Sequence, residues 1–435
     1  MNYQAALSYL DSLSRFGSKL GLERMEQLLA KMGNPEKNLS CLHIAGTNGK
    51  GSTVAMVSSI LREAGLKVGT YTSPHLSSFR ERIALSGEKI PRSSVAQVVE
   101  ELMPLAQSVS GLTKFEFTTA MAFSYFQKAG ADLVVLEVGM GGRLDATNVV
   151  VPVAAGITHL ALDHTGRLGS TLAEIAGEKA GIIKEGRPTV VAPQNSEALF
   201  VVQARAQELG SPLYPVASWP DEGKIRFRGQ AFSLAGSVAD FWLEDLFLPR
   251  VEVGILGRHQ LANAAVALGL AQRVYEAGLV GLEPSAWQAA LRRGLEKARW
   301  PGRLEYFSGK PSLLLDGAHN PDGMEQLALF LQEFFPKARP TVVLGILGDK
   351  DYPSMLSELA PLAGKLIITV PDNPRAADPG ELADRARSFG SQVEVVAQPQ
   401  MALERALKGE ELVVVAGSLY LVGELRGKIQ TFFSQ

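Results

Sequence analysis

The chain is short of cysteine, of net charge and of long apolar runs. A single cysteine, Cys41, stands among its 435 residues, so no disulfide can form within the chain. This suits a reducing compartment and favours a small core residue over a nucleophile at Cys41. A formal net charge of −2 gives no reason to expect nucleic acid or an anionic membrane as a main partner. No apolar stretch approaches the roughly 20 residues that span a bilayer, and the N-terminal MNYQAALSYLDSL is amphipathic rather than signal-like. We therefore expect a cytoplasmic protein that binds neither nucleic acid nor membrane.

A glycine-rich loop between a strand and a helix is the most informative stretch. Apolar residues at 42–45 predict a buried strand, and an apolar helical pattern covers 54–61. The residues between them read GTNGKGS. Glycines let backbone N–H groups point inward, Lys50 can reach terminal phosphates, and the hydroxyl of Ser52 can bind Mg²⁺. The common form is G-x-x-x-x-G-K-[ST], from which this stretch departs, because Gly51 separates the lysine from the serine. We interpret it as an ATP-binding loop rather than as an ordinary turn that caps a helix.

Polar side chains follow other expected strands of this region. One strand ends at Ser73 and opens into a charged loop that contains His75, and a buried strand at 132–139 carries Glu137 near its carboxyl end. A carboxylate in that place is costly unless it is paired or binds a cation. We interpret Glu137 as a Mg²⁺ ligand rather than as half of a structural ion pair. Ser73 and His75 are either metal or substrate contacts or simple turn residues.

The sequence allows two interpretations for each of several further positions. Asp163 and His164, just past a strand, are either a metal ligand with its orienting partner or a helix cap with its neighbour. Lys179, in GEKAGII, is either a semi-buried amine or part of a solvated helix face. Asn263, in the first turn of a helix, suits both a cap and a hydrogen bond to an adenine edge. Two histidines in or at the end of strands are interpreted as satisfied core residues: His43 and His159.

The length and the apolar pattern predict two α/β domains. A chain of 435 residues is too long for one core of usual size, and the Trp-Pro-Gly sequence at 300–302 breaks any preceding helix. We therefore expect an ATP-binding domain over 1–298, of the P-loop type with a parallel sheet flanked by helices. Its later part shows strand-like segments, two of them at 224–227 and 231–234. The domain over 299–435 alternates apolar runs with helical patterns, which predicts a doubly wound, Rossmann-like sheet.

Polar loops follow several expected strands of the second domain. They contain Asp316 to Pro321, Gly348 to Asp351, and Gly417 to Tyr420. Because the carboxyl ends of parallel strands meet at one edge of a sheet, these loops predict a binding face that closes a cleft against the first domain.

Taken together, the motifs resemble the folylpolyglutamate synthase and dihydrofolate synthase family of the Mur-ligase superfamily. The matching blocks are HIAGTNGKGST, YTSPHL with ERI, VLEVGMGGRLDATN, LDHTGRLG, GEKAGIIK, GRHQLANAA, WPGRLE, LLDGAHNP and GSLYLVGE. They run in order from about residue 40 to residue 424. The spacing of GTNGKGS is the form that the phosphate loop takes in this family.

The resemblance implies an ATP-dependent ligase of folate biosynthesis and one-carbon metabolism. A folate-type carboxylate attacks the γ-phosphate to give an acyl phosphate and ADP. The amine of L-glutamate then attacks the acyl phosphate, which forms the amide and releases inorganic phosphate. Two anions must approach each other in the first step, so Lys50 and Mg²⁺ are needed to offset their repulsion. The loop at 143–146 (RLDA) looks like the bifunctional members, which glutamylate dihydropteroate as well as tetrahydrofolate.

The same resemblance implies a role for each site residue. ATP would be held by Asn48, Gly49, Lys50, Gly51, Ser52, Asn263, Arg303 and Asp316, the last two from the second domain. Mg²⁺, two ions in this scheme, would be ligated by Ser73, Glu137 and His164. The catalytic residues would be Lys50, Lys179 and His319, with Lys179 converted by CO₂ into an anionic carbamate. The substrates would contact Ser18, Lys19, Leu20, Thr113, Lys114, Phe115, Glu116, Leu144, Asp145, Ala146 and Ser418. We expect a monomer whose partners are small molecules.

Two other functions compete with this one. A peptidoglycan-type Mur ligase would use the same ATP site but needs a separate N-terminal domain for its UDP-sugar, and a phosphate loop that starts by residue 46 leaves little room for it. A nucleotide-binding regulator without ligase chemistry would not need Glu137, His164 and Lys179 together.

Overall fold

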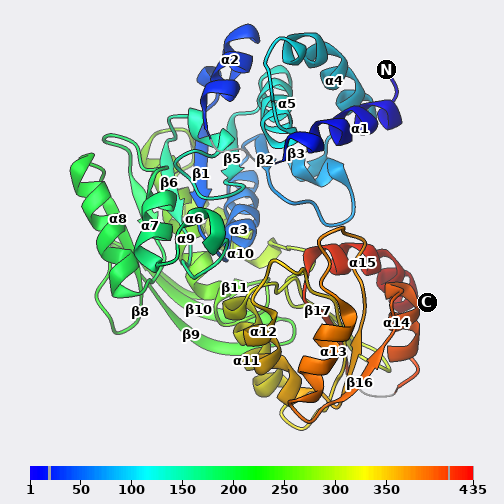
Figure 1. Cartoon of the computed structure of the whole chain (residues 1–435). Coiled ribbons are helices and arrows are strands. Elements are labelled where there is room, and N and C mark those ends of the chain that lie inside the picture. The colour runs from blue at the N-terminus through cyan, green and yellow to red at the C-terminus, as the bar shows by residue number, and fades with distance from the viewer. Residues whose placement is uncertain (18–20, 410–411, 435) are drawn as a thin grey trace.

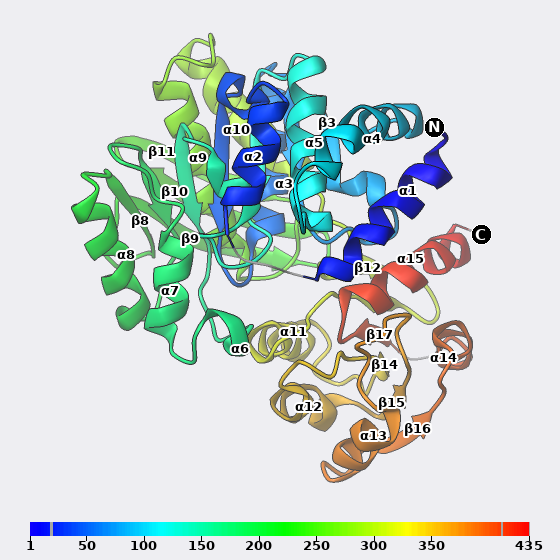
Figure 2. The same ribbon diagram turned by 45° about the horizontal axis from the view of Figure 1, so that its top comes forward.

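Two separate β-sheets organise the chain, an eleven-stranded sheet within residues 41–253 and a six-stranded sheet within residues 305–416 (Figure 1). The computed structural model describes residues 1–17, 21–409 and 412–434. In two views the C-terminal domain, coloured yellow to red, forms a body of its own beneath the N-terminal one (Figures 1 and 2). Over the described residues, no helix is both long and apolar enough to cross a membrane.

The larger sheet has a parallel centre with antiparallel edges. Its order is β11-β10-β9-β8-β7-β6-β1-β5-β2-β3-β4, and neighbours from β9 to β2 are parallel. Its strands are β1 (Cys41–Ala45), β2 (Val68–Tyr71), β3 (Ile83–Leu85), β4 (Glu88–Lys89), β5 (Leu133–Glu137), β6 (Ala154–Ile157), β7 (Thr189–Val191), β8 (Leu213–Ser218), β9 (Ile225–Ser233), β10 (Gly236–Leu243) and β11 (Leu246–Val253). The prediction of two separate strands at 224–227 and 231–234 is wrong, because both segments belong to one strand, β9. The pairing of β9 with β10 shifts register between Gly229 and Ala231, and this bulge interrupts the apolar pattern.

Helices cover both faces of this sheet, as the alternation of its central strands requires. Leu42 and Ile44 of β1 belong to the core formed with α3, α9 and α10, whereas Cys41 belongs to the core formed with α1, α2, α4 and α5. Cys41 is therefore a core residue, as predicted. The helices are α1 (Tyr3–Ser12), α2 (Glu23–Lys31), α3 (Lys50–Glu63), α4 (Arg92–Gln107), α5 (Lys114–Lys128), α6 (Thr165–Leu168), α7 (Leu172–Ala180), α8 (Ser196–Glu208), α9 (Gln260–Glu276) and α10 (Pro284–Lys297).

The smaller sheet is doubly wound, as the sequence predicts. Its order is β12-β13-β17-β14-β15-β16, and all neighbours except β12 and β13 are parallel. Leu314 packs in a core with α11, α12 and α13, whereas the adjacent Leu313 packs in a core with α14 and α15. The strands are β12 (Glu305–Phe307), β13 (Leu313–Leu315), β14 (Thr341–Leu344), β15 (Lys365–Ile368), β16 (Gln392–Val395) and β17 (Val413–Ala416). The helices are α11 (Pro321–Phe334), α12 (Tyr352–Leu359), α13 (Pro379–Arg387), α14 (Pro399–Ala406) and α15 (Leu419–Phe433).

The connection between the domains passes close to the phosphate loop. The chain leaves α10 at Lys297 and enters β12 at Glu305. Within this connection lies Trp300, whose ring is so near to Gly51 that an added Cβ there would come within 2.7 Å of Nε1. The predicted boundary at 298/299 falls at the start of this connection and stays a prediction.

Candidate active site

The predicted phosphate loop joins the end of β1 to the first turn of α3. Gly49, directly before the helix, has φ of +90°. A side chain there would also collide with Asn263, whose Oδ1 would lie 2.3 Å from the added Cβ. Glycine is therefore required at this position for two independent reasons. The backbone N–H groups at 49–52 lie in the first turn, where a helix supplies no acceptor of its own, and these residues line a cavity.

This first cavity, of about 340 Å³, collects residues from both domains. The linker and the carboxyl ends of β1, β5, β6 and β13 supply most of its walls. Every residue expected to hold ATP or metal or to act in catalysis lines it, namely Asn48, Gly49, Lys50, Gly51, Ser52, Ser73, Glu137, His164, Lys179, Asn263, Arg303, Asp316 and His319. The tertiary structure therefore brings together residues from eight separate blocks of sequence that extend from Asn48 to His319.

Two lysines meet on one carbonyl oxygen in this cavity. Lys50 Nζ donates to Gly46 O at 2.9 Å and to Thr47 O at 3.0 Å, and Lys179 Nζ donates to the same Gly46 O at 2.9 Å. Burial lowers the pKa of Lys179 to about 7, and the positive charge of Lys50 acts in the same direction. Burial also lowers the pKa of Lys50. Lys179 is only 5% exposed, so the structure favours the buried amine over the solvated helix face.

The expected metal ligands combine a carboxylate, a hydroxyl and an imidazole. Glu137 ends β5, is buried, and accepts a hydrogen bond from the backbone N–H of Ser73 at 3.1 Å. Burial raises its pKa and the nearby Lys50 opposes that shift, so Glu137 is a carboxylate that a cation would stabilise. His164 lies at the start of α6, and burial lowers its pKa, which keeps the ring neutral as a metal ligand requires.

This donor set fits Mg²⁺ bound together with a nucleotide. Among the described residues, no three His, Cys, Asp or Glu side chains converge into a complete metal site. Mg²⁺ in nucleotide sites keeps several waters and takes only one or two carboxylates together with phosphate oxygens. One carboxylate with the Ser73 hydroxyl therefore meets the requirement.

The C-terminal domain contributes a buried carboxylate and a histidine. Asp316 accepts hydrogen bonds from Leu304 N and Ala318 N, both at 2.8 Å, and burial raises its pKa against the opposing charge of Arg303. His319 Nδ1 lies 2.8 Å from Gly317 O. A carbonyl oxygen can only accept, so Nδ1 carries the proton and Nε2 keeps its lone pair. Burial lowers the pKa of His319 to about 4, and the ring is neutral near pH 7.

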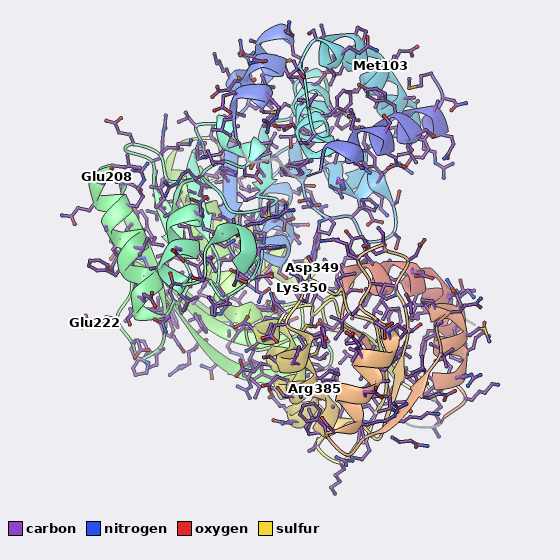
Figure 3. All side chains as sticks on the ribbon, viewed as in Figure 1. Met103, Glu208, Glu222, Asp349, Lys350 and Arg385 are labelled. Carbon is purple, nitrogen blue, oxygen red and sulfur yellow. The ribbon has the colours of Figure 1, made fainter. Side chains whose placement is uncertain are left out.

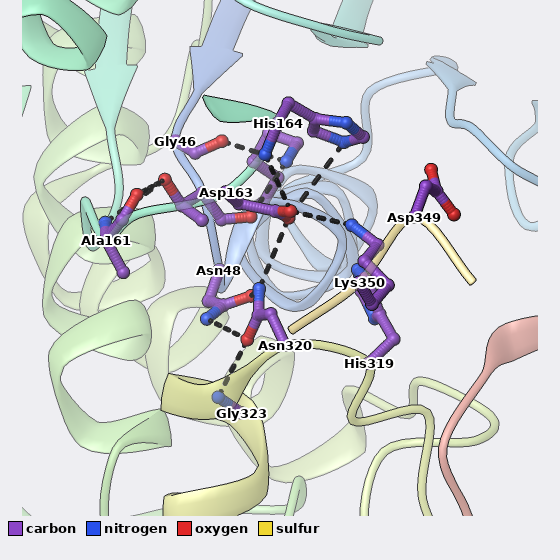
Figure 4. A network of polar contacts seen from close by, with 12 residues as sticks. Gly46, Asn48, Ala161, Asp163, His164, His319, Asn320, Gly323, Asp349 and Lys350 are labelled. Carbon is purple, nitrogen blue, oxygen red and sulfur yellow. Dashed lines mark hydrogen bonds and ion pairs between the residues drawn. The ribbon is translucent and has the colours of Figure 1, made fainter. Parts of the chain in front are cut away.

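A polar network joins the two domains across the mouth of the phosphate loop (Figure 4). The amides of Asn48 and Asn320 exchange two hydrogen bonds, at 3.0 and 3.1 Å. Asn48 also donates to Asp322 at 2.6 Å, and Asn320 donates to Asp163 at 3.3 Å. Lys350 then pairs with Asp163 at 2.6 Å, and both side chains are about nine-tenths buried. Figure 3 shows Lys350 at the junction of the domains, which this network holds together.

Two predictions on histidines have opposite outcomes. His43 is fully buried with Nε2 at 2.8 Å from Thr147 Oγ1, which confirms the core position. Its hydrogen bonding is only half satisfied, because the buried Nδ1 has no partner among the described residues. The core role predicted for His159 is wrong, because its side chain is 44% exposed and lines the first cavity, with Nε2 2.9 Å from Asp322 Oδ1. Strand β6 ends at Ile157, so residue 159 already lies beyond the sheet.

A second cavity, of about 600 Å³, contains most of the expected substrate residues. Thr113, Phe115, Glu116, Leu144, Asp145, Ala146 and Ser418 line it. The two cavities adjoin, because seven residues line both of them: Ser73, Pro74, Gly139, Met140, His164, His319 and Leu419. Lys114 instead pairs with Asp11 at 2.7 Å and is not among the lining residues. The remaining three, Ser18, Lys19 and Leu20, lie outside the described residues.

Several of the residues expected to contact substrate also form hydrogen bonds within the protein that shape the second cavity. Asp145 accepts four hydrogen bonds, from Thr147 N and Oγ1, Gly139 N and Met140 N. Thr113 and Glu116 form a capping box at the start of α5. Ser418 caps α15 by accepting from Leu421 N at 3.1 Å.

The sequence patterns did not single out Asn320, Asp322 or Lys350 individually. The first two lie in the loop 316–321 and the turn after it, and Lys350 lies in the loop 348–351, both of which follow strands. The signal for a binding face was present, but a partner in the other domain cannot be seen in a local pattern.

Two family models match the chain. The model of the Mur ligase middle domain covers residues 44–271, and the model of the Mur ligase glutamate ligase domain covers residues 302–419. The dihydrofolate synthase/folylpolyglutamate synthase of Bacillus subtilis is 38% identical over 98% of this chain and 99% of its own length.

Solved structures agree with these matches. The folylpolyglutamate synthase of Mycobacterium tuberculosis in complex with ADP superimposes with a TM-score of 0.89, at 32% identity over 100% of this chain and 99% of the other. Escherichia coli FolC in complex with DHPP and ADP has a TM-score of 0.85, at 31% identity over 98% of each chain.

Proposed function

The chain belongs to the folylpolyglutamate and dihydrofolate synthases of the Mur ligase family, and we propose that its one active site glutamylates both dihydropteroate and tetrahydrofolate. It is an ATP-dependent ligase that joins glutamate to a folate. The observation that carries the proposal is the meeting of the phosphate loop, Lys179, Glu137 and His319 in a cavity that adjoins a second, larger one. A regulator without ligase chemistry has no use for that second cavity.

ATP binding uses both domains in this proposal. The N–H groups at the start of α3 and the Lys50 ammonium take the phosphates, and Lys50 turns toward them from its present acceptor, Gly46 O. Asn263 and Asp316 bracket the rest of the nucleotide from α9 and from the C-terminal domain. Arg303 adds a cation from the linker. ATP therefore favours the closed arrangement, because its sites are complete only when the domains meet.

Ser73, Glu137 and His164 would hold Mg²⁺. When bound, the cation neutralises phosphate charge, so that the acyl carboxylate can approach the γ-phosphate. The Ser73 backbone N–H, which donates to Glu137, keeps one carboxylate oxygen engaged and orients the other.

Lys179 fits a carbamate. Carbamate formation needs a neutral amine, since the nitrogen lone pair attacks CO₂ and one proton is released. A pKa of about 7 supplies that amine near neutral pH, which an ordinary lysine does not. The product is an anion beside the Lys50 ammonium, so the reaction replaces a neutral amine next to a cation by an ion pair.

His319 is proposed to take the proton that the glutamate amine loses when it attacks the acyl phosphate. Its Nε2 lone pair is free, its ring is neutral, and it lines both cavities at the point where they meet. The pterin end of either acyl substrate would lie in the second cavity against Phe115 and Ala146. We further propose a cytoplasmic monomer, because both halves of the site come from one chain and its lone cysteine is free.

Phosphate release from ATP tests the proposal. The purified protein is given Mg²⁺ and ATP with L-glutamate and either dihydropteroate or tetrahydrofolate, and with each substrate omitted in turn. Release that needs a pterin and glutamate together is the expected result with both pterins. Tight ATP binding without phosphate release in any mixture would contradict ligase activity. Phosphate release with glutamate and tetrahydrofolate, but not with glutamate and dihydropteroate, would contradict activity on both pterins. Glu137→Gln should lose turnover and also lose the Mg²⁺ dependence of ATP binding.

A further inference from the structure

Arg82 is a cation at the active site that none of these steps uses. It ends the short 3₁₀ helix Phe79–Arg82, and its backbone O accepts from Thr72 N at 3.0 Å, which fixes it beside the end of β2 and Ser73. Its Nε donates to Nδ1 of His75 at 2.9 Å. A guanidinium nitrogen can only donate, so Nδ1 of His75 is the acceptor and carries no proton. This bond orients the guanidinium and leaves its two terminal nitrogens for other partners.

The other charged groups around the second cavity are already matched or exposed. Lys350 pairs with Asp163, Arg375 with Asp349, and Arg24 with Glu116, at 2.6, 3.1 and 2.9 Å, while Asp145 has its four N–H and O–H donors. Arg167, the remaining cation, is exposed. Over the described residues, Arg82 is the partly buried cation of this cavity that no carboxylate of the protein contacts. The negative charge of Glu137 acts on Arg82 from a distance but forms no ion pair with it. An enclosed cation without a paired anion is costly unless a ligand supplies one.

We propose that Arg82 binds a carboxylate of a glutamyl unit, through the paired N–H groups of its guanidinium. The inference rests on the proposed function. A guanidinium matches a carboxylate with two parallel hydrogen bonds, which fixes orientation as well as charge. Its neighbour Ser73 lies where the two cavities meet, so a glutamyl unit held by Arg82 lies next to the reacting groups.

Two substrates carry such a carboxylate. Incoming L-glutamate keeps both of its carboxylates through the reaction, whereas tetrahydrofolate offers the α-carboxylate of its terminal glutamate. Dihydropteroate has no glutamyl unit, and its single carboxylate is the one that reacts. Comparison of the two acyl substrates therefore separates the sources.

The experiment measures KM and kcat for Arg82→Gln with each acyl substrate and with L-glutamate. Loss of a charge-assisted carboxylate contact should raise one KM by about 10- to 100-fold. A higher KM for L-glutamate with both acyl substrates assigns the site to the incoming amino acid. A higher KM for tetrahydrofolate with that of dihydropteroate unchanged assigns it to the terminal glutamyl unit. Unchanged KM values, a fall in kcat alone, or a rise in the KM of dihydropteroate would each overturn the proposal.

Two control variants and one binding measurement accompany this test. Arg187→Gln removes the same charge at an exposed position that lines neither cavity and should leave every KM unchanged. Arg82→Lys keeps the charge but not the planar pair of donors, so its KM should lie between those of the parent and Arg82→Gln, even if the latter folds poorly. If the parent protein shows no glutamylation, the proposed function fails. Calorimetric titration of L-glutamate and tetrahydrofolate into parent and variant then still decides the role of Arg82.

Discussion

Replacement of Lys179 by methionine should stabilise the protein near neutral pH, by an amount that shrinks as the pH rises. In the folded chain the pKa of Lys179 is lowered from 10.5 to about 7, first by burial and then by Lys50. Between these two pH values the unfolded chain binds a proton that the folded chain does not. The stability of the parent protein therefore rises with pH in that window, by about 1.4 kcal/mol per pH unit.

The magnitude follows from the size of the shift. Lowering the pKa of Lys179 from 10.5 to about 7 corresponds to about 5 kcal/mol of folding free energy. The parent protein is destabilised by this full amount below pH 7 and by none of it above pH 10.5. Methionine has nearly the same shape and takes no proton, so the variant lacks this slope. The advantage of Lys179→Met should be largest at pH 7 and smaller by about 3 kcal/mol at pH 9.5.

Urea unfolding followed by tryptophan fluorescence is the assay. Three of the four tryptophans, Trp219, Trp242 and Trp287, lie in the N-terminal domain, which contains Lys179. The fourth, Trp300, lies in the connection with its ring beside Gly51, so the signal reports mainly on the N-terminal domain. The buffers exclude CO₂ and nucleotide. Bicarbonate added at pH 8 should then stabilise the parent and not the variant, since only the parent can form a carbamate. Turnover of Lys179→Met should fall far more than its ATP affinity.

The exposed Lys337 supplies the control. Lys337→Met should change stability by less than about 0.5 kcal/mol, equally at both pH values. A stability difference for Lys179→Met that does not depend on pH, or a variant less stable than the parent at pH 7, would refute the reasoning. Full turnover in Lys179→Met would in addition exclude the carbamate.

Two other predictions compare matched positions. Gly49→Ala should abolish ATP binding in a calorimetric titration, because the φ of +90° and the closeness of Asn263 both exclude a side chain at Gly49. Gly65 is the matched control, since it has a φ of +91° and open space around it. Gly65→Ala should lower the free energy of unfolding by only about 1 kcal/mol and retain ATP binding. Lys350→Met should leave Asp163 without its ion-pair partner at the domain junction and favour opening by about 3–5 kcal/mol, seen as a larger radius of gyration in small-angle scattering. Arg375→Met, which breaks an exposed pair, should leave that radius unchanged, and a compact Lys350→Met would argue against the ion pair as a tie between the domains.

Local chemistry explains why much of the site could be predicted. A buried strand that ends in glycines and lysine has few uses other than phosphate binding, and Glu137 at the end of an apolar strand is costly without a cation. Both statements depend only on near neighbours in the chain, and both residues line the first cavity. Where the local pattern was ambiguous, as for Lys179, the side chain proved buried, and packing from elsewhere in the chain decided the matter.

Periodicity and turn chemistry act over a few residues, so the two α/β domains, the phosphate loop and the polar ends of the strands could be predicted from the sequence. Folding of the whole chain was needed to show that His159 faces Asp322, that Asn48 meets Asn320, and that Arg82 is the enclosed cation left without a paired carboxylate. These relations join residues far apart in the chain, and they exist only when the domains are packed together. A cation's free energy depends on every charge around it in space, and a sequence pattern does not contain that sum.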